Sequence, residues 1–104
     1  MKKTGQIKIV WEYIVKPEHL EGFLKAYSPD GSWATLFMEH RGYIATELIR
    51  DTSHSMRFLT IDHWESLSAY SEMKNRSRKA YRELDEKFEK YTVDENYIGI
   101  FEGV

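Results

Sequence analysis

Four stretches of the chain alternate between apolar and polar residues with the two-residue period of a β-strand. They cover residues 7–15, 43–50, about 56–65 and 96–102. A polar turn of only five residues, 51–55, separates the second stretch from the third. Two strands joined by so short a connection are predicted to form a hairpin.

The third of these stretches organises the rest of the chain. Phe58, Thr60, Asp62 and Trp64 fall on one face of the predicted strand. Ser66 follows directly and matches a helix N-cap, because its hydroxyl can accept a hydrogen bond from a backbone N–H of the first turn. The sequence therefore predicts a strand that leads straight into a helix, with an indole and a carboxylate at the junction.

Helical spacing of apolar residues marks the intervening segments. Pro17 suits the first position of a helix that continues to Tyr27. After the turn-rich segment 28–32, a short helix is predicted from Trp33, with Asp30 or Ser32 near its cap and Gly42 after its end. A long helix is predicted over residues 66–91, with Asn75 as a point of interruption or bending.

The order β-α-(α)-β-β-α-β is typical of an α+β, ferredoxin-like split βαβ fold. We expect residues 1–104 to form one domain, a four-stranded antiparallel sheet with the helices on one face. The other face then carries apolar residues, including Ile14, Leu48, Leu59 and Ile61. An apolar face of this size is unusual for a monomer, so a two-fold homodimer through the sheet face is predicted.

Composition excludes several function classes. The net charge is −2, from 15 basic and 17 acidic residues, which argues against nucleic-acid binding. The chain has no cysteine, so disulfides, thiolate catalysis and Cys-based metal sites are excluded. No apolar stretch resembles a signal peptide or a membrane span, and a cytoplasmic protein is expected. No metal site is predicted, since the four histidines lie on four different elements: His19, His40, His54 and His63.

Aromatic and polar residues are predicted to line a pocket between sheet and helices, as in sites for small apolar ligands. The catalytic candidates are Asp62, Trp64 and His40, and the candidate ligand-binding residues are Trp11, Tyr13, Trp33, Phe37, Thr60, Tyr70 and Tyr81. Alternatively, the rings simply fill the core.

Asp62 and His40 are the candidate bases. An aspartate buried among rings has a raised pKa and can accept a proton, unless it is held in an ion pair or a cap. His40 lies near the end of the second helix, where it serves either as a general base or as a structural cap. Nucleophilic serine catalysis lacks support, because no serine occupies a G-x-S-x-G elbow.

The sequence resembles the antibiotic biosynthesis monooxygenase-like family of dimeric α+β barrels. Segments 9–15, 41–51, 57–66 and 98–102, together with Lys16-Pro17, carry the resemblance, which extends over almost the whole chain. It implies a ferredoxin-like fold, a homodimer and a pocket in each subunit. Family members include cofactor-free oxygenases of aromatic polyketides and haem-degrading enzymes.

The resemblance also implies roles for individual residues. Trp64 corresponds to the tryptophan at the end of the third strand in both catalytic branches. The haem-degrading branch has an asparagine on the first strand and a histidine on the long helix, where this chain has Glu12 or Tyr13 and Tyr81. These departures argue against haem degradation.

Two functions follow as hypotheses. The first is a cofactor-independent monooxygenase that acts on a small phenol- or quinol-type aromatic, with Asp62 or His40 as the base. The second is a non-catalytic small-molecule-binding or stress-associated dimeric barrel protein.

Overall fold

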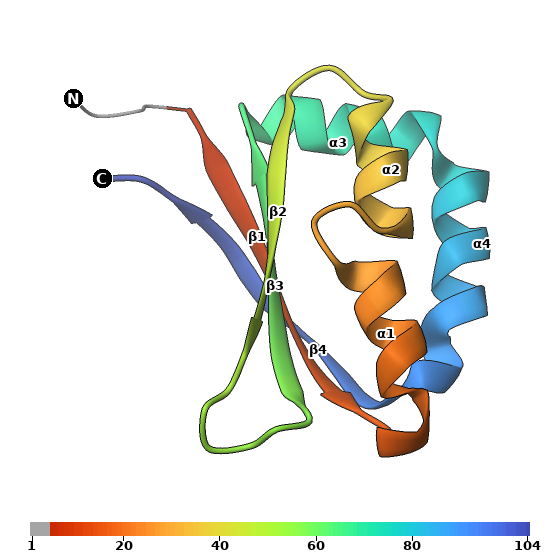
Figure 1. Ribbon diagram of the computed structural model, residues 1–104. Coiled ribbons are helices and arrows are strands. Elements are labelled where there is room, and N and C mark those ends of the chain that lie inside the picture. The colour runs from red at the N-terminus through yellow and green to blue at the C-terminus, as the bar shows by residue number, and fades with distance from the viewer. Residues whose placement is uncertain (1–4) are drawn as a thin grey trace.

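Antiparallel pairing joins the four strands into one sheet in the order β2-β3-β1-β4. The computed structural model describes residues 5–104. Its strands are β1 (Ile7–Val15), β2 (Tyr43–Arg50), β3 (Arg57–Trp64) and β4 (Thr92–Glu102). Its helices are α1 (Leu20–Tyr27), α2 (Ser32–Met38), α3 (Leu67–Arg76) and α4 (Arg78–Phe88), with 3-10 turns η1 (Pro17–His19) and η2 (Glu89–Tyr91). All four α-helices cover one face of the sheet, as the α+β prediction requires (Figure 1).

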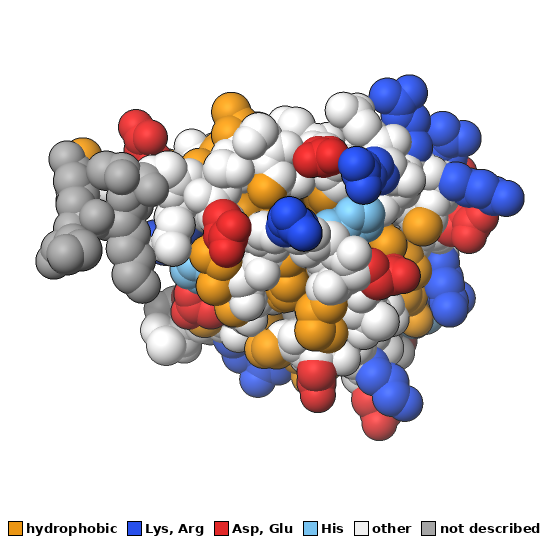
Figure 2. Space-filling model, turned by 90° about the horizontal axis from the view of Figure 1, so that it is seen from above, with side chains coloured by type: hydrophobic (Ala, Val, Ile, Leu, Met, Phe, Trp, Pro, Cys, Tyr) orange, Lys and Arg blue, Asp and Glu red, His pale blue; other side chains and the backbone are white. Residues whose placement is uncertain are grey.

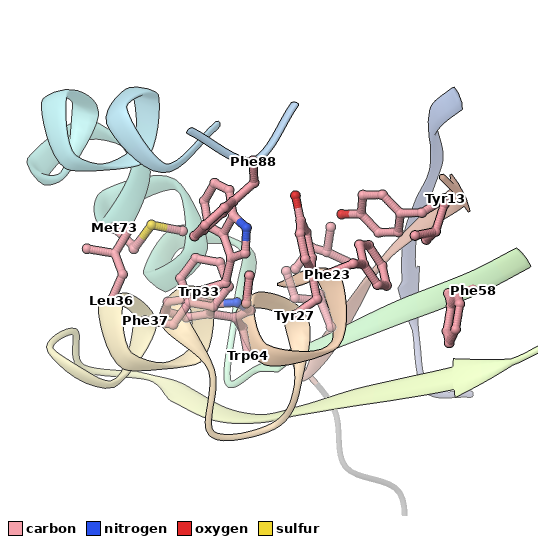
Figure 3. Packing of buried hydrophobic residues seen from close by; sticks show 14 residues of the cluster. Tyr13, Phe23, Tyr27, Trp33, Leu36, Phe37, Phe58, Trp64, Met73 and Phe88 are labelled. Carbon is pink, nitrogen blue, oxygen red and sulfur yellow. The ribbon is translucent and has the colours of Figure 1, made fainter. Parts of the chain in front are cut away.

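The core lies between this face and the helices (Figure 3). Inward-facing residues of β1 and β3 supply its sheet side, and Ile9, Val15 and Trp64 are at most 1% exposed. The predicted face of β3 is confirmed, because Phe58, Thr60 and Trp64 are all buried. Alternation of the sequence therefore gave the correct orientation of both central strands.

The predicted cap at Ser66 is also confirmed. Its hydroxyl accepts a hydrogen bond of 3.1 Å from the backbone N–H of Ala69 in the first turn of α3. A serine hydroxyl in this position satisfies one of the N–H groups that have no partner within the helix. The cap fixes where β3 ends and α3 begins.

The predicted long helix is in fact two helices. It breaks at Ser77, where φ is −110° and ψ is 23°, and α4 then runs in a different direction from α3 (Figure 1). Strand β4 also starts at Thr92 rather than at Asn96. Its first residues pair with the end of β1, with Glu95 opposite Tyr13, so the sheet is longer there than expected.

The predicted faces of β2 are wrong after its first residue, because the strand contains a β-bulge. Tyr43 pairs with Trp64 and Ala45 pairs with His63, which leaves Ile44 as the extra residue. One extra residue reverses the alternation, so Tyr43 shares the inner face with Thr46. Leu48 for the same reason packs against the core and not on the outer face.

The start of α2 lies within one residue of the prediction. The helix begins at Ser32 rather than Trp33, and its N-cap is Gly31, with Asp30 and Ser32 on either side. A Cβ at Gly31 would lie 2.5 Å from the carbonyl oxygen of Lys25, so the turn between α1 and α2 requires glycine. Gly42 has the positive φ expected of it, 95°, although α2 ends four residues earlier, at Met38.

Candidate functional site

A cavity of about 180 Å³ lies between the inner face of the sheet and the helices. The sheet contributes Trp11, Tyr13, Thr46, Thr60, Asp62 and Glu95, and the helices contribute Tyr27, Trp33, Phe37, Lys74, Tyr81 and Asp85. Every strand and every α-helix therefore supplies at least one lining residue. The buried and half-buried members form its interior, whereas Lys74, Asp85 and Glu95 are exposed and form its rim.

Asp62 is the acidic group of the interior. Thr46 donates a hydrogen bond of 2.7 Å to its Oδ1, and the Thr46 hydroxyl also lies 2.7 Å from that of Tyr43. Burial raises the pKa of Asp62 to about 6, although the Thr46 hydrogen bond and the charge of His63 lower it. A carboxylate with this pKa is mostly ionised at neutral pH and is basic enough to accept a proton from a bound acid.

Aromatic rings form most of the interior wall. The rings of Trp33 and Tyr81 meet edge to face at 4.9 Å, and the rings of Tyr13 and Tyr27 are also 4.9 Å apart. Figure 3 shows the hydroxyl group of Tyr13 pointing toward Tyr27. Burial raises the pKa of both hydroxyls and of Tyr81 well above the usual value. These tyrosines stay protonated and can donate hydrogen bonds at any physiological pH.

Seven of the ten residues predicted for the site line the cavity: Trp11, Tyr13, Trp33, Phe37, Thr60, Asp62 and Tyr81. The three others, Trp64, Tyr70 and His40, do not. Strand alternation predicted the lining residues of the sheet in this group, and helical spacing predicted those of α2.

Trp64 lies in the closed core and not beside the cavity. It is 0% exposed, and its ring packs edge to face against Phe37, Tyr43 and Tyr70 at 5.4 to 5.9 Å. The expectation that Trp64 borders the pocket is therefore not met. The rings of these three residues, which belong to α2, β2 and α3, close off the indole. Tyr70 packs on Trp64 in this cluster and does not reach the cavity lining.

His40 also lies away from the cavity. Its Nε2 is 2.5 Å from the hydroxyl oxygen of Ser77, at the break between α3 and α4. This contact ties the end of α2 to the junction of the other two helices. The structural alternative considered for His40 fits this placement better than a role as the base for a ligand in the cavity.

Five lining residues were not predicted: Tyr27, Thr46, Lys74, Asp85 and Glu95. Thr46 was missed because of the bulge, and Glu95 because β4 was predicted to start one residue after it. Tyr27 was missed because it belongs to the apolar stripe of α1. Its hydroxyl group was the one feature that could have indicated a place in the cavity wall. Lys74 and Asp85 sit among many exposed charges, and nothing in the sequence distinguishes them.

Among residues 5–104, no three His, Asp or Glu side chains come together in an arrangement that suits a metal ion. None of the helices in this part of the chain is both long and apolar enough to cross a membrane.

No protein-family model and no curated protein matches this sequence. Solved structures do match its fold. A proposed antibiotic biosynthesis monooxygenase from Bordetella bronchiseptica superimposes with a TM-score of 0.76 at 19% identity, over 97% of this chain and 99% of its own. SnoaB, a cofactor-independent oxygenase from Streptomyces nogalater, superimposes with a TM-score of 0.68 at 15% identity, over 94% of this chain and 92% of its own.

The fold is that of the antibiotic biosynthesis monooxygenase-like proteins. Rv0793 from Mycobacterium tuberculosis shares it as well, with a TM-score of 0.73 at 8% identity over 96% of each chain. The fold expected from the sequence resemblance is thus confirmed. Sequence identities this low show a shared fold alone, so the chemistry depends on the residues of the cavity.

Proposed function

We propose that the cavity binds a small phenol-type aromatic and that Asp62 accepts its hydroxyl proton, so that the resulting anion reacts with molecular oxygen without a cofactor. One observation carries the proposal: an ionisable carboxylate with a pKa of about 6 lies inside an aromatic-walled cavity. Perturbed carboxylates in such places are typical of catalytic bases. The monooxygenase-like fold is consistent with this chemistry.

The size of the cavity limits the substrate. Its volume is about 180 Å³, whereas an apolar cavity of roughly 150 Å³ is enough for one benzene molecule. A single ring with small substituents fits this volume, and a fused polyketide does not. We therefore propose a monocyclic phenol or hydroquinone.

The reaction balances without an external reductant. Asp62 takes the hydroxyl proton, and the electron-rich ring of the phenolate forms a carbon–oxygen bond with O₂. The peroxide formed then loses water, so that one oxygen atom stays on the ring as the second carbonyl of a quinone. The phenol supplies all four electrons that O₂ accepts. Tyr13 and Tyr81 line the cavity and have raised pKa values, which supports a role for their protonated hydroxyls as hydrogen-bond donors to developing oxyanions.

A non-catalytic binding protein is the second candidate. It is favoured by the placement of Trp64 and His40, two of the three predicted catalytic residues, outside the cavity. On this account the same cavity holds the aromatic molecule and releases it unchanged.

Oxygen uptake with a panel of monocyclic phenols separates the two candidates. The wild type should consume O₂, and Asp62→Asn should lower turnover by about 10² to 10⁴, the usual contribution of a general base. Glu86→Gln is a matched control, because Glu86 is an exposed carboxylate that does not line the cavity. Equal turnover by wild type and Asp62→Asn would contradict the catalytic proposal, and binding without oxygen uptake would support the second candidate.

We also propose that the outer face of the sheet forms a homodimer interface. Ile49 and Phe101 are 43% and 50% exposed, and Leu59 and Ile61 lie between them on the same face. Burying this face against a second copy would remove the largest part of the exposed apolar sheet surface. Light scattering should give twice the monomer mass for the wild type and the monomer mass for Ile61→Lys; a monomeric wild type would contradict the interface.

A further inference from the structure

The rim of the cavity carries charged side chains from three elements that are far apart in the sequence. Lys74 comes from α3, Asp85 from α4 and Glu95 from the early part of β4. All three are exposed. The break at Ser77 and the early start of β4 bring these residues to one opening, so the rim is a product of the fold and not of a local charge cluster.

The two rim carboxylates have no cationic partner. No ion pair within residues 5–104 includes Asp85 or Glu95. Loss of hydration and, after it, the nearby negative charges of Asp85 and Glu89 raise the pKa of Glu95. A cation at the rim would relieve this repulsion.

Lys74 offsets only one of the two negative charges at the rim. Its ammonium group lies over the rings of Tyr70 and Tyr81, 5.5 and 5.3 Å from their centroids. Tyr81 itself lines the cavity. The one cationic side chain among the lining residues thus lies on ring faces, an environment that attracts ammonium groups. Counting Asp62, the lining holds three carboxylates and one ammonium group.

We propose that the ligand of this cavity is a monocyclic phenol that carries a positively charged amine, with the hydroxyl at Asp62 and the ammonium group between Asp85 and Glu95. The proposal rests on the proposed function, because it takes the phenol hydroxyl at Asp62 as one end of the ligand. It adds the chemistry of the other end. Among phenols of equal size, the rim then selects the cationic one and disfavours the anionic one.

Three commercially available phenols test this selection, because they share a hydroxyphenylethyl skeleton and differ in charge. Tyramine is cationic, 4-ethylphenol is neutral and 3-(4-hydroxyphenyl)propionate is anionic at neutral pH. Isothermal titration calorimetry of the whole protein at low salt should show the highest affinity for tyramine, a lower one for 4-ethylphenol and the lowest for the propionate. The affinities for tyramine and 4-ethylphenol should differ by about tenfold. Added salt should reduce the preference, since the rim is exposed.

Two matched double variants test whether the rim carboxylates cause the preference for tyramine. Asp85→Asn combined with Glu95→Gln should bring the ratio of tyramine to ethylphenol affinity close to one. Glu83→Gln combined with Glu86→Gln removes the same charge from α4 at exposed positions outside the cavity, and should keep the tenfold ratio. Circular dichroism of both double variants checks that they fold alike.

The outcomes distinguish this inference from the proposed function. If ethylphenol binds and is oxidised while the three ligands bind equally, or if the rim variant keeps the preference, the inference is overturned and the proposed function stands. If tyramine is preferred through the rim but no O₂ is consumed, the inference stands and the oxygenase proposal fails. If none of the three ligands binds, both are wrong.

Discussion

Asp62 and Trp64 are two residues apart on the same face of β3, yet their surroundings differ completely. Trp64 is closed off by Phe37, Tyr43 and Tyr70, whereas Asp62 borders an open cavity. Both belong to β3, on the sheet face that the helices cover (Figure 1). The difference shows that sharing a strand face places residues near each other, and that the packing of the facing elements decides which of them meets a ligand.

A second comparison concerns the charges at the molecular surface and at the cavity rim. Figure 2 shows apolar side chains exposed among charged ones, with basic side chains gathered at the side of the molecule where α4 lies. The cavity rim on α4 is instead acidic, through Asp85. The other exposed charges of α4 are of both signs: Arg78, Lys79, Arg82, Glu83, Glu86 and Lys87.

The largest effect on stability is expected at the closed end. Trp64→Ala removes a fully buried indole and should lower the free energy of unfolding by about 3–5 kcal/mol. Trp11→Ala at the cavity should cost clearly less, because Trp11 is only half-buried and packs on Tyr97. Urea unfolding measures both. Equal losses for the two variants would remove the distinction between a closed core and an open site.

The second effect concerns the pH dependence of stability. Burial raises the pKa of Asp62 from 3.8 to about 6, so the folded state binds more protons than the unfolded state between these values. Stability should therefore fall as the pH rises through this window, by up to about 3 kcal/mol for this group.

Asp62→Asn should abolish this component. The difference between wild type and variant isolates it, because Glu12 and Asp51, whose pKa values are lowered, act in the opposite direction in both proteins. Urea titrations at pH 4.5 and 7 give the measurement. If the difference between the two proteins does not change with pH, Asp62 does not have the raised pKa.

The smallest effect is expected from the hydrogen bond that supports Asp62. Thr46→Val removes the donor at 2.7 Å, which holds the pKa of this carboxylate down. The acidic limb of the pH–rate profile should then move upward by roughly one pH unit, about 1.4 kcal/mol. Thr35→Val is a control on α2, where the hydroxyl bonds only the Gly31 carbonyl. A profile that shifts equally in both variants would argue against a specific role of Thr46.

Much of the fold could be predicted from the sequence, because regular alternation and helical spacing report directly on buried faces. The inner face of β3 and the cap at Ser66 are examples. The bulge at Ile44 could not be predicted, since any residue can occupy a bulge. The bulge also reverses the alternation of inner and outer residues along the rest of β2.

The site was predictable to a similar extent. Asp62 was found because a carboxylate among inward-facing rings is conspicuous in a strand pattern. Trp64 was misplaced because strand alternation gives the face on which a residue lies, but not which rings of the facing helices α2 and α3 cover it. Asp85 and Glu95 were missed for another reason: a rim residue looks like any solvent-exposed charge until the fold brings distant elements to one opening.

The most direct test of the central claim is a crystal structure with 4-ethylphenol bound. The account predicts the ring between the aromatic walls of the cavity and the hydroxyl oxygen within about 2.6–3.2 Å of the Asp62 carboxylate, the distance that proton transfer requires. A ring bound in the cavity with its hydroxyl turned to the rim, away from Asp62, would contradict it. So would a ligand that binds elsewhere and leaves the cavity beside Asp62 without it.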